Sequence, residues 1–251
     1  MNPTITIVTA CRNAQATLER AVRSVLGQTW PGVEYLVIDG ASTDGTLDIL
    51  ERYRDRITLV SEPDDGVYFA LNKALRIARG DWILFLGADD YLLTPSTLEE
   101  AAGKMTDPDA VYYGDVYCGS EDKRLWGEVS RHTVMRKFIC HQGIFYPRSA
   151  YRSLEYDTRY QICADRVYNI TLMSRGVPFR YLDQVISFYS EGGLSAHASD
   201  PVYQKDELRL AWKLGPLSFL DLTSHRIHFH IREYLRRHRF FAPASSSNKA
   251  E

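Results

Sequence analysis

Strand-type and helix-type segments alternate four times in the first 106 residues, and this alternation constrains the fold more than any other feature. Apolar runs of strand length occur at residues 5–10, 34–39, 57–60 and 82–86. Each run is followed by apolar residues at helical spacing, as in the stripe formed by Leu18, Ala21, Val22, Val25 and Leu26. Unbroken apolar strands between amphipathic helices are typical of a parallel sheet covered on both faces. The sequence therefore predicts an α/β fold with a doubly wound sheet and helices on both faces.

The second half of the chain has a less regular pattern. Strand-type segments are expected at residues 110–117, 125–129 and 179–189, and helical ones at 162–173 and 201–214. We therefore expect mixed strands in this half. The predicted organisation is one domain over 1–215, divided at 106, and a basic amphipathic segment over 216–251 that ends in a disordered tail.

Acidic residues follow three of the first four predicted strands. Asp39 ends the second strand, Asp64 and Asp65 follow the third, and Asp89 and Asp90 follow the fourth. Ligands of open α/β sheets gather at the carboxyl ends of the strands, which is where these carboxylates fall. Turn formation or helix capping explains one such residue, but neither requires carboxylates at three neighbouring strand ends. The pattern favours a ligand site in which Asp89 and Asp90 could hold a divalent cation.

Charge and cysteine content narrow the class of protein. The net charge of -2 gives no global field for nucleic acid, and we expect none as a partner. The four cysteines form no Cys-x-x-Cys pair, so free thiols in a reducing compartment are expected. No leader and no apolar run of membrane-helix length occurs in the sequence. These features predict a cytoplasmic protein, at most peripheral on the inner face of the membrane.

Eight segments resemble, in order, the motifs of the family 2 glycosyltransferases, which have a GT-A fold. They are residues 5–13, 37–46, 61–68, 71–74, 85–90, 113–116, 140–145 and 164–166. The resemblance covers the chain from Ile5 to about Ser195. It implies a nucleotide-diphosphate sugar donor bound by the half at 1–106, an acceptor bound by the half at 107–215, and inversion at the anomeric carbon. The Gln-x-x-Arg-Trp motif of processive synthases is absent, which favours addition of a single sugar.

The resemblance also implies which residues bind the nucleotide-sugar. Ala10 and Arg12 stand in the base-binding turn, and Asp39 would accept a hydrogen bond from a base N–H. Asp64 would close the base pocket, although a turn residue explains it equally well, and Asp89 would face the ribose and the metal. Arg12 stands where the family often has an aromatic residue, and a guanidinium can also stack on a base.

The metal and proton-transfer residues follow from the same motifs. Asp89 and Asp90 would hold Mg²⁺ or Mn²⁺, because Gly87 occupies the first position of the Asp-x-Asp motif. Asp165 is the candidate catalytic base, and its alternative is a surface carboxylate paired with the neighbouring Arg166. His141 would contact the acceptor or the diphosphate, or would be a structural histidine.

The segment at 225–241 is basic and aromatic. It contains Arg226, Arg232, Arg236, Arg237 and Arg239 among apolar side chains. Such a segment suits a helix lying on a membrane, and a lipid-linked acceptor would make that contact useful. A packed terminal helix with a solvated basic face is the alternative.

Together the sequence predicts an inverting glycosyltransferase that adds one sugar to a glycan or lipid-linked acceptor in cell-surface polysaccharide synthesis. A sugar nucleotidyltransferase is one alternative, although its Gly-rich phosphate loop is missing after the first strand, where residues 10–13 are Ala-Cys-Arg-Asn. A non-catalytic glycan-binding protein on the same fold is the other.

Overall fold

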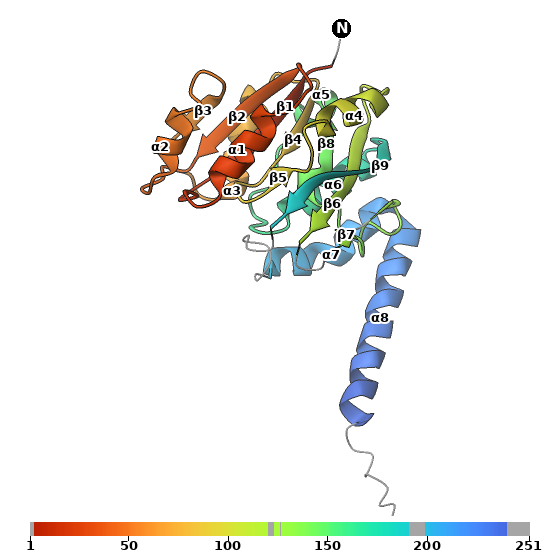
Figure 1. Ribbon diagram of the computed structural model, residues 1–251. Coiled ribbons are helices and arrows are strands. Elements are labelled where there is room, and N and C mark those ends of the chain that lie inside the picture. The colour runs from red at the N-terminus through yellow and green to blue at the C-terminus, as the bar shows by residue number, and fades with distance from the viewer. Residues whose placement is uncertain (1–2, 120–122, 126, 191–198, 240–251) are drawn as a thin grey trace, which may run out of the picture.

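The computed structural model describes residues 3–119, 123–125, 127–190 and 199–239 (Figure 1). The strands are β1 (Ile5–Cys11), β2 (Val33–Asp39), β3 (Thr58–Ser61), β4 (Trp82–Phe85), β5 (Tyr91–Leu92), β6 (Val111–Cys118), β7 (Lys123–Leu125), β8 (Ile144–Pro147) and β9 (Phe179–Tyr189). The helices are α1 (Leu18–Leu26), α2 (Thr46–Glu51), α3 (Val67–Ile77), α4 (Thr97–Lys104), the 3-10 turn η1 (His141–Gly143), α5 (Arg148–Tyr151), α6 (Ala164–Ser174), α7 (Pro201–Leu214) and α8 (Pro216–Arg239).

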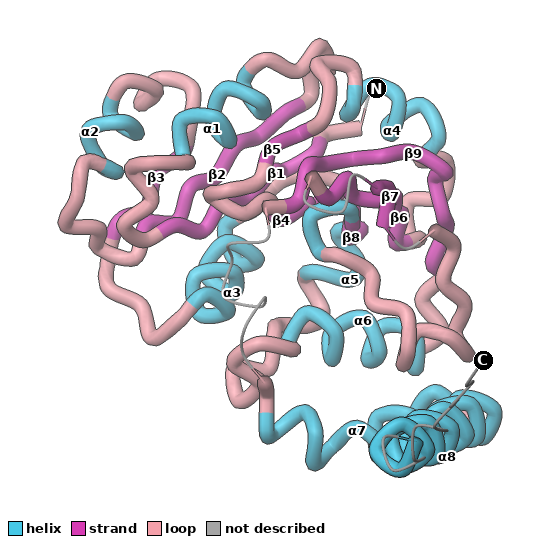
Figure 2. Tube along the Cα trace, turned by 60° about the horizontal axis from the view of Figure 1, so that its bottom comes forward, coloured by secondary structure: helices cyan, strands magenta, loops and turns pink. Residues whose placement is uncertain are grey.

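The first half of the chain forms a parallel sheet, as the strand and helix alternation predicts. β1 pairs with β2 on one side and β4 on the other, β2 pairs with β3, and all three pairings are parallel. Figure 2 shows α1, α2 and α4 on one face of the sheet and α3, α5 and α6 on the other. The fold class is confirmed, because both faces of the sheet are covered. Parallel pairing also places the carboxyl ends of β1, β2 and β4 at the same edge.

The second half continues the same sheet with mixed strand directions. β8 lies between β4 and β6 and runs antiparallel to both, while β9 is parallel to β6. The short strand β5, which follows the acidic pair, pairs antiparallel with β9. The described part of the sheet therefore crosses from the first half of the chain to the second, and β9 ends beside the turn that carries Asp89 and Asp90.

One strand of the second half differs from its prediction. A strand is expected at 125–129, but the strand that pairs with β6 here is β7, Lys123–Leu125, which includes only Leu125 of the expected segment. Gly127 has a φ of 60°, in the left-handed region, and turns the chain away from the sheet. The backbone of Val129 then bonds to the hydroxyl of Tyr113 at 2.9 and 3.1 Å instead of to a strand. A short alternating pattern does not reveal where a glycine ends the pairing.

The two terminal helices leave the sheet. α7 packs against α6, and α8 contacts α7 at its start and then projects away from the domain (Figure 1). The predicted boundary at 216 coincides with the first residue of α8. Within the described ranges, no helix has both the length and the apolarity needed to cross a bilayer.

Candidate active site

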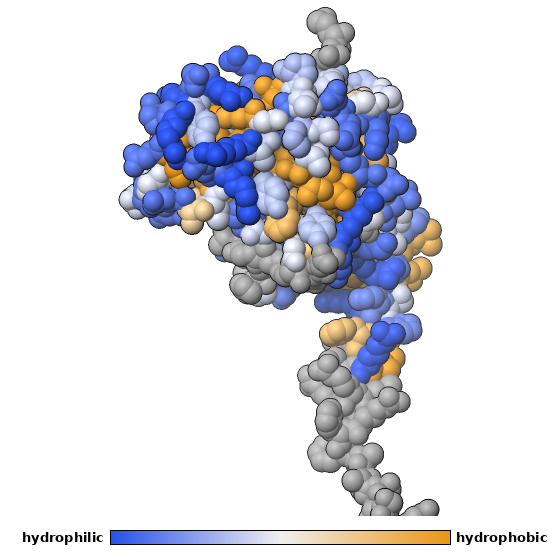
Figure 3. Space-filling view, viewed as in Figure 1, coloured by the Kyte–Doolittle hydropathy of each residue, from blue (hydrophilic) through white to orange (hydrophobic). Residues whose placement is uncertain are grey.

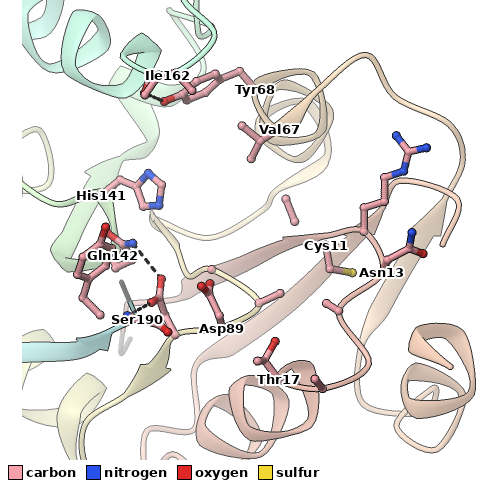
Figure 4. Close-up of a pocket in the computed structure, with 18 of the residues that line it drawn as sticks. Cys11, Asn13, Thr17, Val67, Tyr68, Asp89, His141, Gln142, Ile162 and Ser190 are labelled. Atoms are coloured by element: carbon pink, nitrogen blue, oxygen red, sulfur yellow. Dashed lines mark hydrogen bonds between the residues drawn. The ribbon is translucent and has the colours of Figure 1, made fainter. Parts of the chain in front are cut away.

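A cavity of about 570 Å³ lies at the carboxyl ends of β1 and β4 (Figure 4). Its walls come from the turn after β1, the first turn of α3, the acidic turn after β4, η1 and the end of β9. The lining residues are 10–14, 16–17, 67–68, 87–90, 141–142, 161–162 and 189–190. Parallel strands that end together create this hollow, because the loops that follow them diverge.

Asp89 and Asp90 form the floor of the cavity. β4 ends at Phe85, so both residues lie in the following turn and not in the strand. Asp90 is buried, and its two carboxylate oxygens accept hydrogen bonds from Gln142 Nε2 at 2.9 Å and from the Ser190 N–H at 2.8 Å. Asp89 is half-buried, and its carbonyl accepts a hydrogen bond from Arg20 at 2.8 Å. Side chains and backbone from three other segments therefore fix this turn.

Burial makes the negative charge on Asp90 unfavourable. It raises the pKa of Asp90 to about 6, and the neighbouring charge of Asp89 adds to the rise, while the donors Ser190 and Gln142 oppose it. The folded protein therefore binds this proton more tightly than the unfolded chain does. The resulting loss of stability develops as the pH rises from the ordinary carboxyl pKa to about 6, and it is complete at higher pH.

Asp90→Asn is therefore expected to stabilise the protein at pH values well above 6. An amide keeps the contact with Ser190, and Gln142 can rotate its own amide to pair with it. Removing the buried charge should raise the free energy of unfolding by about 1–3 kcal/mol. Denaturant unfolding of both proteins at about pH 8 and at about pH 4 measures this, and the gain should nearly vanish at the lower pH. An equal gain at both pH values would mean that the charge is not the cause.

Gly87 gives the two carboxylates their space. A Cβ at this position would lie 2.5 Å from Asp90 Oδ2 and 2.9 Å from Asp89 Oδ1. Both carboxylates therefore fold back over the glycine, which stands where the related motif has its first aspartate. Two adjacent carboxylates together with diphosphate oxygens suit Mg²⁺ or Mn²⁺, which proteins often bind through one or two carboxylates. In the described ranges, no group of three or more His, Cys, Asp or Glu residues could hold a metal.

Gly87→Ala should displace these carboxylates without unfolding the protein. The methyl group would meet the ends of two side chains, and Asp90 would lose its alignment with Gln142 and Ser190. We expect a loss of about tenfold in Mn²⁺ affinity, equivalent to about 1.4 kcal/mol, measured by calorimetry with a nucleoside diphosphate present. Gly103→Ala on α4 is the matched control, because nothing lies within 4 Å of its added methyl group. Unchanged Mn²⁺ affinity in Gly87→Ala would contradict this role.

His141 and Asp165 meet on the wall formed by η1 and the start of α6. Asp165 lies in the first turn of α6, is 4% exposed and does not line the cavity, whereas His141 does. His141 Nδ1 lies 3.5 Å from Asp165 Oδ2. The hydroxyl of Tyr68 lies within hydrogen-bonding distance of two acceptors, the carbonyl oxygen of Ile162 at 2.6 Å and Asp165 Oδ1 at 3.2 Å. Asp165 is therefore held directly behind two residues of the cavity wall.

The electrostatic surroundings of His141 favour its charged form. Burial alone lowers the pKa of His141, but the adjacent Asp165 and the charges of Asp90 and Asp89 outweigh burial and raise it above its ordinary value. The alternative of a surface ion pair between Asp165 and Arg166 is wrong. Asp165 is buried, and the Arg166 guanidinium donates to the Met135 carbonyl instead.

The predicted nucleotide residues divide into two groups. Ala10 and Arg12 line the cavity, but Asp39 is fully buried behind it. Its carboxylate accepts hydrogen bonds from the Ser42 N–H at 3.0 Å, from Ser61 Oγ at 2.7 Å and from the hydroxyl of Ser42. Both oxygens of Asp39 are thus bonded to protein, and a contact with a base stays a prediction.

Arg12 and Asp64 face each other over Gly40. A Cβ on Gly40 would lie 2.9 Å from Asp64 Oδ2 and 3.4 Å from Arg12 Cδ, so the glycine allows both side chains to approach. Asp64 Oδ1 also accepts the Gly66 N–H at 3.1 Å, which is ordinary turn chemistry. Asp64 is not among the residues that line the cavity. Its role in closing a base pocket stays a prediction.

Sequence reasoning missed four residues that hold the site together. Gln142 and Ser190 bind the two oxygens of Asp90, Arg20 binds the carbonyl of Asp89, and Tyr68 contacts Asp165. Gln142 and Tyr68 stand inside segments that resemble family motifs, which is the only signal that could have drawn attention to them. Cys11 also lines the cavity, but burial and the neighbouring Asp39 raise the pKa of its thiol, so it stays protonated.

Comparison with known proteins finds relatives in sequence and in fold. The sequence model described as Glycosyl transferase family 2 matches residues 6–177. A "PGL/p-HBAD biosynthesis glycosyltransferase" of Mycobacterium bovis (strain BCG / Pasteur 1173P2) is 34% identical over 223 residues, which cover 85% of this chain and 87% of that protein. The Escherichia coli "UDP-Glc:alpha-D-GlcNAc-diphosphoundecaprenol beta-1,3-glucosyltransferase WfaP" is 26% identical over 204 residues, 77% of this chain and 80% of that protein.

Two solved structures share the fold. Residues 1–349 of TarS from S. aureus, in complex with UDP-GlcNAc, superpose with a TM-score of 0.70 at 19% identity. The match covers 84% of this chain and 66% of the TarS chain, so this chain spans just under two thirds of that structure. The mannosyltransferase PcManGT from Pyrobaculum calidifontis, in complex with GDP-Man and Mn²⁺, gives a TM-score of 0.64 at 18% identity, over 90% of this chain and 76% of that one. At these identities the likeness concerns the fold alone.

Proposed function

This chain belongs to glycosyl transferase family 2, and from that premise we propose that it moves one sugar from a nucleotide-diphosphate sugar to a glycan or lipid-linked acceptor, with inversion at the anomeric carbon. The observation that carries the proposal is one cavity with a fixed acidic turn, Asp89 and Asp90, on its floor and the pair His141 and Asp165 on its wall. The relatives named for PGL/p-HBAD biosynthesis and for a diphosphoundecaprenol acceptor support a role in cell-surface polysaccharide synthesis.

The donor would lie across the ends of β1 and β4. Its base would occupy the space beside Ala10 and between Arg12 and Asp64, where the guanidinium can stack on the ring. Asp39 would fix this region from behind, or would exchange one of its serine partners for a base N–H. The diphosphate would then reach Asp89. A solved structure with this fold is in complex with GDP-Man and Mn²⁺, which supports a nucleotide-sugar as the class of donor.

Asp89 and Asp90 would hold Mg²⁺ or Mn²⁺ together with the diphosphate oxygens. The ion supplies positive charge that stabilises the leaving nucleoside diphosphate. Asp89 suits direct binding because it is half-buried beside the cavity, and Asp90 offers the remaining lone pairs of its two bonded oxygens. Gln142, Ser190 and Arg20 keep this turn in position while the ligand binds.

Asp165 would accept the proton of the acceptor hydroxyl. Inversion requires a base on the face of the sugar opposite the leaving group, and Asp165 stands directly behind His141, on a different segment from the acidic turn. Tyr68 orients its carboxylate, and His141 stands between it and the cavity. The proton passes either directly to Asp165 or first to His141, whose partner Asp165 then stabilises the charged imidazole.

The proposal assigns donor binding to residues 1–106 and acceptor binding to 107–215. It places the protein in the cytoplasm, with peripheral contact to the inner face of the membrane through residues 225–241. The side chains of 230 and 233–241 lie outside the described part of the chain, so the contact is supported by the earlier turns of α8 and by the sequence.

A donor screen tests the proposal most directly. The protein is incubated with UDP-, GDP- and dTDP-sugars, with and without Mn²⁺, and donor hydrolysis and transfer are followed by mass spectrometry. We expect one nucleotide class to stabilise the fold and to release a nucleoside diphosphate. Release of pyrophosphate from a nucleoside triphosphate would favour a nucleotidyltransferase instead. Binding of a glycan without any turnover would favour a non-catalytic protein.

A further inference from the structure

We propose that the solvent-facing side of α8, together with a basic groove beside it, docks on a bilayer that contains anionic phospholipid. The proposal specifies the membrane contact proposed above, and it extends that contact to residues before 225 and to a groove shared with the domain. It is independent of sugar transfer, because it can be measured without donor or acceptor.

An apolar stripe runs along the outer side of α8. Leu217, Leu220, Ile227 and Ile231 are 60%, 59%, 58% and 51% exposed. With Ser224 they follow each other at steps of three and four residues, which places them on one side of the helix. The buried residues Ser218 and Leu222 belong to the opposite side, which packs on the domain. Large aliphatic side chains that are half or more exposed in a row are unusual on a solvated surface and mark an interaction site.

A basic groove flanks this stripe. It has a volume of about 280 Å³ and is lined by Arg136, Ser224, His225, His228, Phe229 and Arg232. Nε and Nη2 of Arg136 donate to the two carboxylate oxygens of Asp221, at 2.6 and 2.8 Å, so this ion pair is internally neutral and joins the domain to α8. Arg232 and the two imidazoles therefore provide the donors toward a ligand. The sequence adds Arg236, Arg237 and Arg239 in the last turns of the same helix.

The combination of stripe and groove matches the chemistry of a membrane surface. An interfacial helix buries its apolar side at the boundary of the acyl chains, and its cationic flank meets the phosphates. Figure 3 shows the two kinds of residue next to each other on the part of α8 that projects from the domain, with apolar residues in orange and hydrophilic ones in blue. Because this part of α8 extends away from the domain, there is space for the flat surface of a bilayer along the helix.

A second copy of the chain fits this surface less well. Paired helices place residues of opposite charge along the edges of their seam. Among the described side chains from Leu217 to Arg232, the one acidic residue is Asp221, which is already paired with Arg136, whereas His225, Arg226, His228 and Arg232 are basic. The polar Ser224 also interrupts the middle of the stripe. Charge complementarity therefore favours an anionic partner.

Vesicle co-sedimentation of the full-length protein tests the inference. The protein is mixed with vesicles of phosphatidylcholine alone or of phosphatidylcholine with phosphatidylglycerol, at low and high salt. We expect binding only to the anionic vesicles, and weaker binding at high salt. The double variant Leu220→Ser with Ile227→Ser, and separately Arg232→Glu, should each lower the partition coefficient about tenfold or more. These residues are exposed, so the variants should unfold at the same temperature as the parent protein.

Matched controls separate this surface from general effects of charge and polarity. Ile77→Ser removes an exposed aliphatic side chain from α3, and Arg54→Glu reverses an exposed charge after α2. Both should bind vesicles like the parent. Equal partition of the α8 variants and the parent would overturn the inference. So would a concentration-dependent dimer in lipid-free light scattering that Leu220→Ser with Ile227→Ser abolishes, because a second copy would then cover the stripe. Loss of sugar transfer with normal vesicle binding would count only against the proposed function.

Discussion

Asp165→Asn is expected to lower the rate of sugar transfer by about 10³-fold while changing donor affinity by less than about twofold. A general base typically contributes a factor of about 10²–10⁴ to the rate, and asparagine cannot accept the acceptor proton. The amide has the same shape, so it can still accept from Tyr68 and pack at the start of α6. The donor would bind at the opposite side of the cavity and should not sense the change.

Initial rates with a saturating donor, and calorimetric titration of the same donor, measure the two quantities separately. Asp157→Asn is the matched control, because Asp157 is a partly exposed carboxylate outside the cavity that pairs with Arg159 at 2.6 Å. It should leave both quantities unchanged. Turnover of Asp165→Asn at the parental rate would remove Asp165 from the role of base.

His141→Gln distinguishes the two routes of the proton. If His141 receives the proton, its loss alone should cost about as much as the loss of Asp165, and the double variant should be little worse than either single one. The parental rate should then fall as the pH drops through the raised pKa of His141, because the charged imidazole cannot accept a proton. In His141→Gln this decline would disappear. If Asp165 acts directly, His141→Gln should retain the same pH dependence on the acidic side.

The sequence was sufficient for the first half of the fold because the information there is local. Apolar runs of strand length and helical stripes such as Leu18 to Val25 form in the structure as predicted, with strand ends displaced by about one residue. The acidic pair was placed correctly at the end of β4 for the same reason. The turn of the chain at Gly127 was missed, because a positive φ leaves no mark in an alternating pattern.

The details of the site depend on contacts between distant parts of the chain. Asp39 has the sequence context of a ligand residue, yet the Ser42 hydroxyl donates to one of its oxygens, and the Ser42 N–H and the Ser61 hydroxyl donate to the other. Asp90 receives its two partners from segments 52 and 100 residues away, and the pairing of β5 with β9 brings Ser190, the more distant of them, to Asp90. Burial, and with it the raised pKa of Asp90, is a property of the assembled cavity. Residue type and spacing predict which side chains have the chemistry to bind a ligand, but not which of them already form hydrogen bonds within the protein.

Asp89→Asn is expected to abolish the stimulation of transfer by metal and to lower the rate at saturating Mn²⁺ by about 10²-fold or more. A cation at the diphosphate contributes several kcal/mol to the stability of the transition state, and each 1.36 kcal/mol corresponds to a factor of ten. Among the described residues, no side chain or backbone N–H donates to the carboxylate of Asp89, and Arg20 donates to its carbonyl oxygen. This carboxylate is therefore available for a cation, whereas Asp90 must share its oxygens with Gln142 and Ser190.

The decisive measurement is the rate as a function of Mn²⁺ concentration, starting from protein treated with chelator. The parent should show a saturable rise, and Asp89→Asn should remain at the rate of the chelated parent. Asp48→Asn replaces an exposed carboxylate on α2 and should follow the parental curve.

A chelated parent that works as fast as the metal-saturated one would contradict metal dependence. In that case the protein itself would have to balance the charge on the diphosphate. In the described part of the chain, two side chains that line the cavity can carry a positive charge: Arg12, and His141 in its charged form. Asp89 and Asp90 would then repel the donor, and their replacement by amides should raise its affinity instead of lowering it. The sign of that change separates a metal site from an acidic turn with a purely structural role.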